Sequence, residues 1–196
     1  TRNNGNINFY NDFKTTKFLP AITIFGEGIF INFDQNYIDS FLQKPELDKE
    51  WELFRDDFEP SEKRKTLLNT VSHCILKATA RTSGYSLTSL KQRLYCNEKM
   101  SGILIYTSSS DAEGTLGGLS RLAETERMHH ILEIAEEISR ICSNDPLCEE
   151  GIFSSDNENN GSVCHSCLLV PETSCEFNNE YLSRGLLKNF WSGLKN

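Results

Sequence analysis

The sequence contains no apolar run long enough to span a bilayer, which takes about 20 consecutive apolar residues. Its first residues, Thr1 to Tyr10, are polar and rich in Asn, so they hold no apolar region of the kind that a secretory signal peptide requires. These absences argue against a membrane role and against an oxidising compartment with a disulfide framework. We therefore expect a cytoplasmic protein whose cysteines are reduced.

The chain also contains no complete helicase, nuclease or nucleotide-binding motif, and it begins with Thr1 rather than Met. We therefore expect it to be a C-terminal piece of a longer protein. Its 196 residues suffice for one large domain with a real hydrophobic core.

Basic residues are in the minority, since 20 Lys and Arg stand against 28 Asp and Glu, and the net charge is −8. A domain that grips nucleic acid over its whole surface needs clustered cations, so this class is disfavoured. Three local basic clusters remain, and short runs of this kind are typical of a solvated helix face. They are Lys63-Arg64-Lys65, Lys91 with Arg93, and Arg184 with Lys188.

Cysteine, by contrast, is clustered: five of the seven cysteines lie between Cys142 and Cys175. Cys164 and Cys167 form a C-x2-C turn, which typically supplies two of the four ligands of a tetrahedral zinc site. Thiolates are soft ligands that suit Zn²⁺, and reduced cysteines are available to bind it. The sequence therefore predicts a zinc module at about residues 142–175.

The expected ligand set includes the C-x2-C pair and Cys175, which lies within a dozen residues of it. For the fourth ligand we favour Cys148, because the preceding Asp145-Pro146 fits a turn that ends a helix and directs the chain toward the pair. Cys142 is the rival candidate, although its position also suits the apolar face of that helix. The predicted ligands are therefore Cys148, Cys164, Cys167 and Cys175.

Four thiolates close the coordination shell and leave no position for a water that the metal could activate. The expected zinc is therefore structural, and its loss should unfold the segment from Cys142 onward. His165 sits between two ligands and is expected to point away from the metal. Cys74 and Cys96 stand alone in the sequence, and we expect both to be buried, unreactive thiols.

The apolar pattern predicts an α+β fold, mainly helical, with a small β-sheet and a C-terminal four-Cys zinc module. We expect residues 1–19 to be a flexible or linking segment and residues 20–196 to form one domain. Two predicted strands form a hairpin around Gly26-Glu27-Gly28, and a further strand over 102–106 is expected to be buried on both faces. Predicted helices span about 45–58, 62–80 and 124–142, with a short helix capped by Ser86 and a closing helix over about 181–194.

The loop Thr107–Gly118 follows the predicted buried strand, and α/β folds usually place ligand sites at the carboxyl ends of strands. Its glycines and serines could cradle a phosphate, but the loop has no Lys where a P-loop would need one. Asp111 and Glu113 could hold Mg²⁺, which would make the chain a metal-dependent nuclease. Because two carboxylates in a loop are commonly just solvated, this enzyme is the alternative and not the favoured interpretation.

Several segments together, in this order, resemble the DrmB family of the DISARM anti-phage system. More broadly, they resemble the MrfA-type zinc-binding domain that accompanies superfamily 2 DNA helicases. The segments are Phe25–Phe30, Leu67–His73, Ser83–Leu90, Ile105–Gly118 and the cysteine segment that ends in Pro171–Cys175. The likeness covers nearly all of residues 20–188. Asn69 departs from the family pattern, in which His is frequent, so we assign the remaining His73 no catalytic role.

The resemblance implies a non-catalytic protein that assists a superfamily 2 DNA helicase in anti-phage defence or DNA processing, with DNA reached through the complex. It also implies that the C-terminal cysteines bind zinc. Cys164, Cys167 and Cys175 match the closing motif of the family, and Cys148 matches its upstream Asp-Pro-x-Cys. Cys142 matches a further family position, which keeps it as the rival fourth ligand.

Overall fold

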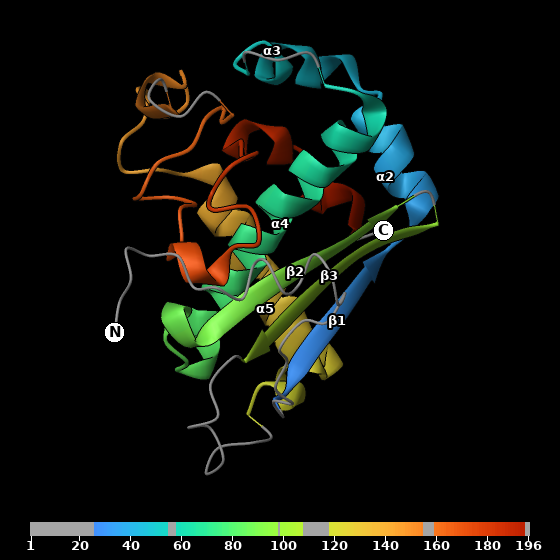
Figure 1. The fold of residues 1–196 in the computed structure, drawn as a ribbon, viewed down its shortest axis with the longest axis vertical. Helices are drawn as coiled ribbons and strands as arrows, with labels where there is room; N and C mark the ends of the chain where they lie inside the picture. Colours follow the sequence, from blue (N-terminus) through green and yellow to red (C-terminus); the bar gives the residue numbers. More distant parts are fainter. Residues whose placement is uncertain (1–25, 55–57, 98, 108–117, 155–158, 195–196) are drawn as a thin grey trace, which may run out of the picture.

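A computed structural model describes residues 26–54, 58–97, 99–107, 118–154 and 159–194 of the chain. Its central elements are a three-stranded antiparallel sheet and two longer helices (Figure 1). The predicted α+β class is confirmed, because helices dominate, the sheet is small and cysteines gather in the C-terminal part. Within the described residues, no helix combines the length and the apolar character that crossing a membrane would take.

The sheet consists of β1 (Gly28–Phe33), β2 (Leu90–Asn97) and β3 (Met100–Thr107), in the order β1-β3-β2. β3 lies in the middle and pairs antiparallel with both neighbours. One face of the sheet is buried, through side chains that alternate along each strand. Its buried hydrophobic residues are Ile29, Phe33, Leu90, Ile103 and Ile105.

Helix α4 (Pro60–Ser83) is the longest element and packs against β2, β3 and the second long helix. Its start is fixed by a capping box between Glu59 and Glu62, with Pro60 at the first helical position. Its end is fixed by Gly84, whose φ of 77° is a left-handed conformation that glycine adopts without steric cost. Residues 66–76 of α4 are all buried, so α4 is the central helix of the domain and other elements pack around it.

Helix α5 (Thr125–Arg140) packs on α4 and buries Ile131, Ala135 and Ile138. The predicted helix over 124–142 therefore exists but ends two residues early. Ile141, the first residue after the helix, is 78% exposed, because the backbone becomes extended there. Cys142 consequently lies beyond the helix and not on its apolar face.

The helix predicted over 45–58 is divided into a 3-10 turn, Pro45–Leu47, and the short helix α3 (Asp48–Trp51). The sequence pattern did not reveal helix α2 (Gln35–Leu42), which begins where Asp34 accepts a hydrogen bond from the backbone N–H of Tyr37 at 2.8 Å. Helix α2 and the 3-10 turn contribute buried apolar side chains to the core, including Phe41 and Leu47.

Ser86 does act as a cap, but for the 3-10 turn Leu87–Ser89, and the chain then enters strand β2. The predicted short helix was wrong because a leucine spacing that suits a helix was overridden by pairing with β3. The first strand of the predicted hairpin lies outside the described residues. β3 is longer than predicted and is not buried on both faces, since Leu104 and Tyr106 are half-buried on the outer side.

The C-terminal part is built from 3-10 turns instead of the predicted helix over 181–194. The backbone at Asn189 has a positive φ of 64°, which separates the turn Arg184–Leu187 from the turn Trp191–Leu194. Phe190, between these turns, is fully buried among the rings of Phe41 and Trp191. Further 3-10 turns span Ser120–Ala123, Ile152–Ser154 and Glu172–Ser174.

A four-sulfur cluster as the candidate metal centre

Four cysteine sulfurs meet in the C-terminal part of the fold, and their Sγ atoms all lie within 4.8 Å of one another. The sulfur of Cys142 lies 3.4 Å from that of Cys164. The sulfur of Cys167 lies 3.7 Å from that of Cys148 and 3.8 Å from that of Cys164. All four residues are buried.

These separations fit a tetrahedral zinc site. With Zn–S bonds of about 2.3 Å, the edges of a sulfur tetrahedron are about 3.8 Å long. The three sulfur–sulfur distances given above, 3.4, 3.7 and 3.8 Å, lie close to that value. Four thiolates would fill all positions of such a shell, so a metal here would be structural and would leave none open for substrate or water.

Two loops supply the sulfurs in pairs. In the first loop, the backbone N–H of Cys142 donates to Asp145 at 2.9 Å, and the N–H of Cys148 donates to the carbonyl of Asn144 at 3.0 Å. In the second, the backbone N–H of Cys164 donates to the sulfur of Cys167 at 3.2 Å. Local hydrogen bonds from the backbone N–H groups, two of them to side chains, therefore hold both loops in a shape that turns the thiols inward.

Hydrogen bonds also prepare one thiol for ionisation. Burial opposes the charged form of Cys164, but hydrogen bonds from Asn144, Cys142 and the backbone of Cys167 lower the pKa of its thiol to about 6. Burial and the neighbouring sulfurs raise the pKa of Cys148. Thiols in such contact cannot all ionise alone, so a cation that binds them displaces protons.

Two cationic side chains flank the cluster. Arg184 is only 6% exposed and pairs with Asp145, in the loop between Cys142 and Cys148. Burial opposes its charge, but attraction by Asp145 and by the sulfurs of Cys167 and Cys148 raises the pKa of Arg184. The second cation, Lys77 on α4, donates to the backbone carbonyl of Cys167. Because four thiolates and one Zn²⁺ leave two negative charges, both cations stabilise the metal-bound form.

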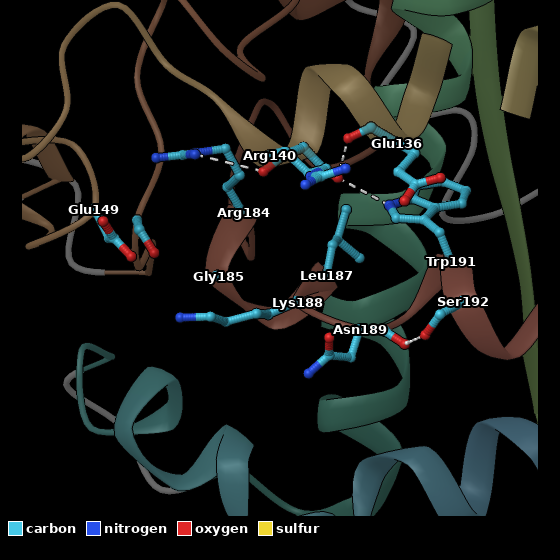
Figure 2. A pocket seen from close by; sticks show the side chains of 12 residues that line it. Glu136, Arg140, Glu149, Arg184, Gly185, Leu187, Lys188, Asn189, Trp191 and Ser192 are labelled. Carbon is cyan, nitrogen blue, oxygen red and sulfur yellow. Dashed lines mark hydrogen bonds between the residues drawn. The ribbon is translucent and has the colours of Figure 1, made fainter. Parts of the chain in front are cut away.

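A cavity of about 450 Å³, lined in part by Arg184, lies between the end of α5 and the C-terminal turns (Figure 2). Its lining mixes the cations Arg140, Arg184 and Lys188 with the acids Glu136 and Glu149. The Nε atom of Arg184 is buried and finds no hydrogen-bond partner within the part of the chain that the structure describes. The mixed charges give this cavity no clear preference for an anion.

Cys175, the remaining member of the expected ligand set, lies in a different environment. Its sulfur is 3.2 Å from Nε2 of His73 and accepts hydrogen bonds from the backbone of Phe177 at 3.3 Å and from Gln92 at 3.6 Å. His73 is fully buried, and its other ring nitrogen contacts the carbonyl of Leu168 at 3.0 Å. The structure thus brings Cys142 to the three sulfurs with which we had grouped Cys175.

The other cysteines and histidines agree with their sequence interpretation in part. His165 is exposed, whereas the sulfurs around it are buried. Cys74 is fully buried on α4, where burial raises the pKa of its thiol. Cys96 is only half-buried, on β2. Asp111 and Glu113, the candidate Mg²⁺ ligands, lie outside the described residues.

Sequence reasoning missed the residues around the cluster. Asn144 contacts two sulfurs, at 3.4 Å each, and its spacing beside Cys142 is the only sequence feature that could have indicated this. Arg184 and Lys77 come from distant segments, and no sequence pattern connects them with the cysteines. Their roles follow only from the packing of α4 and the C-terminal turns.

Comparison with known proteins agrees with this geometry. Residues 71–168 match the family model of the MrfA Zn-binding domain, a range that holds all four clustered cysteines and ends before Cys175. The chain is also 38% identical, over 182 residues, to the DISARM protein DrmB of Bacillus paralicheniformis. That match takes in 86% of this chain but 32% of the relative, so the chain spans about a third of the relative's length.

The sulfur cluster and the family match together make zinc the structural cofactor of this protein. The match over residues 71–168 spans half of the 196-residue sequence. The chain therefore belongs to the MrfA Zn-binding domain family.

Proposed function

We propose that this protein is a zinc-stabilised, non-catalytic domain that assists a superfamily 2 DNA helicase in anti-phage defence, inside the bacterial cytoplasm. The observation that carries the proposal is the closed four-sulfur cluster, which leaves no open metal position for chemistry. The likeness to a DISARM protein supports the defence role, and the sequence resemblance to helicase-associated domains supports the partner. DNA is reached through the complex with the helicase.

The ligand set of the proposal is Cys142, Cys148, Cys164 and Cys167, in place of the set with Cys175. The mutual distances of the four sulfurs and the range of the family match support this choice. Cys175 is instead assigned to a buried hydrogen-bonded pair with His73, which ties its loop to α4. The whole of residues 20–196 is proposed to form one domain around this metal.

Zinc in this position joins segments that have little regular structure of their own. Cys142 and Cys148 follow α5, whereas Cys164 and Cys167 lie in a loop whose Leu168 carbonyl contacts α4 through His73. Because such metal sites contribute their binding free energy to folding, zinc would hold this irregular part in one shape for a partner to recognise. The domain then serves as a rigid docking unit.

The partner is tested by co-purification of the chain with a superfamily 2 DNA helicase from the same genome, followed by an ATPase assay. We expect a stoichiometric complex and a changed DNA-dependent ATPase rate. A folded, zinc-loaded chain that neither co-purifies with the helicase nor alters its ATPase rate would contradict the proposal.

The non-catalytic role is tested separately, with the zinc-loaded chain alone, labelled DNA and Mg²⁺. We expect no cleavage. Cleavage that requires Mg²⁺ and is abolished by Asp111→Ala would instead establish the nuclease alternative.

A further inference from the structure

The outer face of the three-stranded sheet, which points away from the core, exposes several large apolar side chains. Side chains alternate along the strands, so the residues that do not enter the core share this face. Phe30, Tyr95 and Met100 are exposed by 49%, 39% and 37% of their surfaces, values that are high for large apolar side chains. Leu104 and Tyr106 on the central strand are half-buried and complete the patch.

The aromatic rings on this face are held in place. Phe30 and Tyr95 come from the two edge strands, and their rings meet edge to face with centroids 5.6 Å apart. They meet above Gly102 of the central strand, where an added Cβ would lie 2.5 Å from the ring of Phe30. The missing side chain therefore makes room for the ring, and each ring loses little freedom when a flat ligand stacks on it.

The charge of this face differs from that of the whole protein. Lys91 and Arg93 point outward from β2, opposite Tyr106 and Leu104 of β3 in the strand register. None of the outward residues of the three described strands is acidic, although the chain carries a net charge of −8. Cations and aromatic rings are thus interleaved on one surface.

Carboxylates do lie at two borders of the face, and both are engaged. Glu27 accepts hydrogen bonds from the hydroxyl of Tyr85 at 2.6 Å and from the backbone of Ser120 at 3.1 Å. Glu176 accepts one from the backbone N–H of Leu94 at 3.1 Å. These contacts hold the acidic groups at the rim.

Hollows also lie beside the cations. A cavity of about 490 Å³ is lined in part by Gly28, Lys91 and Tyr106. A second, of about 210 Å³, is lined in part by Lys91, Arg93 and Tyr106 on the side toward Thr173. Lys91 and Tyr106 therefore line both depressions, and each depression also has one of the two rim acids in its lining, Glu27 in the first and Glu176 in the second.

We propose that the outer face of this sheet binds single-stranded nucleic acid directly, with bases stacked on Phe30, Tyr95 and Tyr106 and phosphates held by Lys91 and Arg93. Aromatic rings on which bases can stack, beside cations that hold phosphates, are the features with which proteins bind single-stranded nucleic acid without reading its sequence. Lys91, Arg93 and Tyr95 follow one another at two-residue intervals on the outer face of β2, about 6.7 Å apart, a spacing that suits successive nucleotides of an extended nucleic acid. The protein then contacts the single-stranded nucleic acid itself, in addition to any DNA that it reaches through a helicase.

The test uses the zinc-loaded chain alone and a fluorescein-labelled 12-nucleotide oligothymidylate, followed by fluorescence anisotropy. We expect binding that weakens with salt, with a slope of log K against log salt of about −1.4, from two phosphate contacts at about 0.7 each. Lys91→Gln and Arg93→Gln should each reduce the slope by about 0.7, whereas Lys49→Gln, an exposed lysine on α3, should not.

The aromatic residues are tested with paired substitutions. Tyr95→Leu keeps an apolar side chain but removes the ring, so we expect affinity to fall about 5- to 150-fold, whereas Tyr95→Trp should preserve it. Phe153→Ala removes an aromatic residue that is 47% exposed elsewhere and should leave affinity unchanged. Thermal unfolding of each variant confirms that the fold is kept.

Two results would overturn the inference: no oligonucleotide binding by the folded wild-type chain, or equal binding by Tyr95→Leu and wild type. In the second case, a separate co-purification of Tyr95→Leu with the helicase shows whether the face belongs to a protein partner instead. Since this assay contains no helicase, its failure would leave the proposed helicase partnership intact.

Discussion

Arg184 and Asp145 form an ion pair that links the last part of the chain to the loop holding Cys142 and Cys148. The arginine is 6% exposed, and its guanidinium lies close enough to the sulfurs of Cys148 and Cys167 for their charges to raise its pKa. A single side chain thus connects the C-terminal turns with the metal centre.

Replacing Arg184 with Met should weaken zinc binding and destabilise the fold by about 3 kcal/mol, because it leaves Asp145 without its buried partner. It also removes a positive charge that offsets the thiolates. The free energy of unfolding by urea, in excess zinc, measures the first effect. The rate of zinc transfer to a chromogenic chelator measures the second.

The matched control for Arg184→Met is the double variant with Asp145→Asn. If the ion pair is the cause, Asp145→Asn should lower the free energy of unfolding far less in the Arg184→Met background than it does in wild type, since the two residues share one interaction. Strict additivity of the two effects would assign the loss to packing and not to the pair.

Single Cys→Ser changes should separate the two possible ligand sets. Changes at Cys142, Cys148, Cys164 and Cys167 should each lower zinc content and unfold the C-terminal part, because each removes a ligand. Cys175→Ser should keep one equivalent of zinc. Elemental analysis of the purified variants measures the metal directly.

The informative comparison is between Cys142→Ser and Cys175→Ser. Full zinc in the first and loss in the second would restore the ligand set expected from the sequence. Circular dichroism of both variants shows whether a loss of metal accompanies a loss of structure.

The sequence predicted those structural features that depend on residues close to one another in the chain. The apolar period placed α4 and α5 to within a few residues, and α4 also carries its own start and stop residues, Pro60 and Gly84. The C-x2-C turn likewise indicated zinc, because the geometry that holds Cys164 and Cys167 together is contained in four residues.

Features that depend on distant contacts could not be predicted in this way. β2 was interpreted as a helix because Leu87, Leu90 and Leu94 repeat at helical spacing, whereas the pairing with β3 decides the structure. Cys175 was grouped with the C-x2-C pair because it is near in sequence. His73, from α4, contacts that sulfur in the fold, and nothing local to Cys175 indicates it.

The packing at Phe190 accounts for the order of the closing turns. Its ring lies among those of Phe33, Tyr37, Phe41 and Trp191, with centroids 5.2 to 6.1 Å apart. Phe190→Ala should therefore cost about 3 to 5 kcal/mol of stability, and Phe190→Leu clearly less. Urea unfolding measures both, and equal stability of the two variants would show that this site collapses around the smaller side chain.

His73 should make stability depend on pH. Burial lowers the pKa of its imidazole to about 4, against an ordinary value of 6.5 in the unfolded chain. Above pH 6.5 both states are neutral, so the contribution of His73 is complete. Between pH 6.5 and 4 only the unfolded chain takes up the proton. The free energy of unfolding therefore decreases as the pH is lowered through this range, by on the order of 3 kcal/mol.

His73→Gln tests this dependence, because Gln retains hydrogen-bonding groups for Leu168 and Cys175 but does not titrate in this range. Urea unfolding at pH 7.5 and pH 5, in saturating zinc, should show a smaller loss in the variant than in wild type. Zinc release at low pH is common to both proteins and cancels in the comparison. Equal losses would mean that the acid sensitivity comes from the thiolates, because His73 would then take up its proton in the folded chain as readily as in the unfolded one.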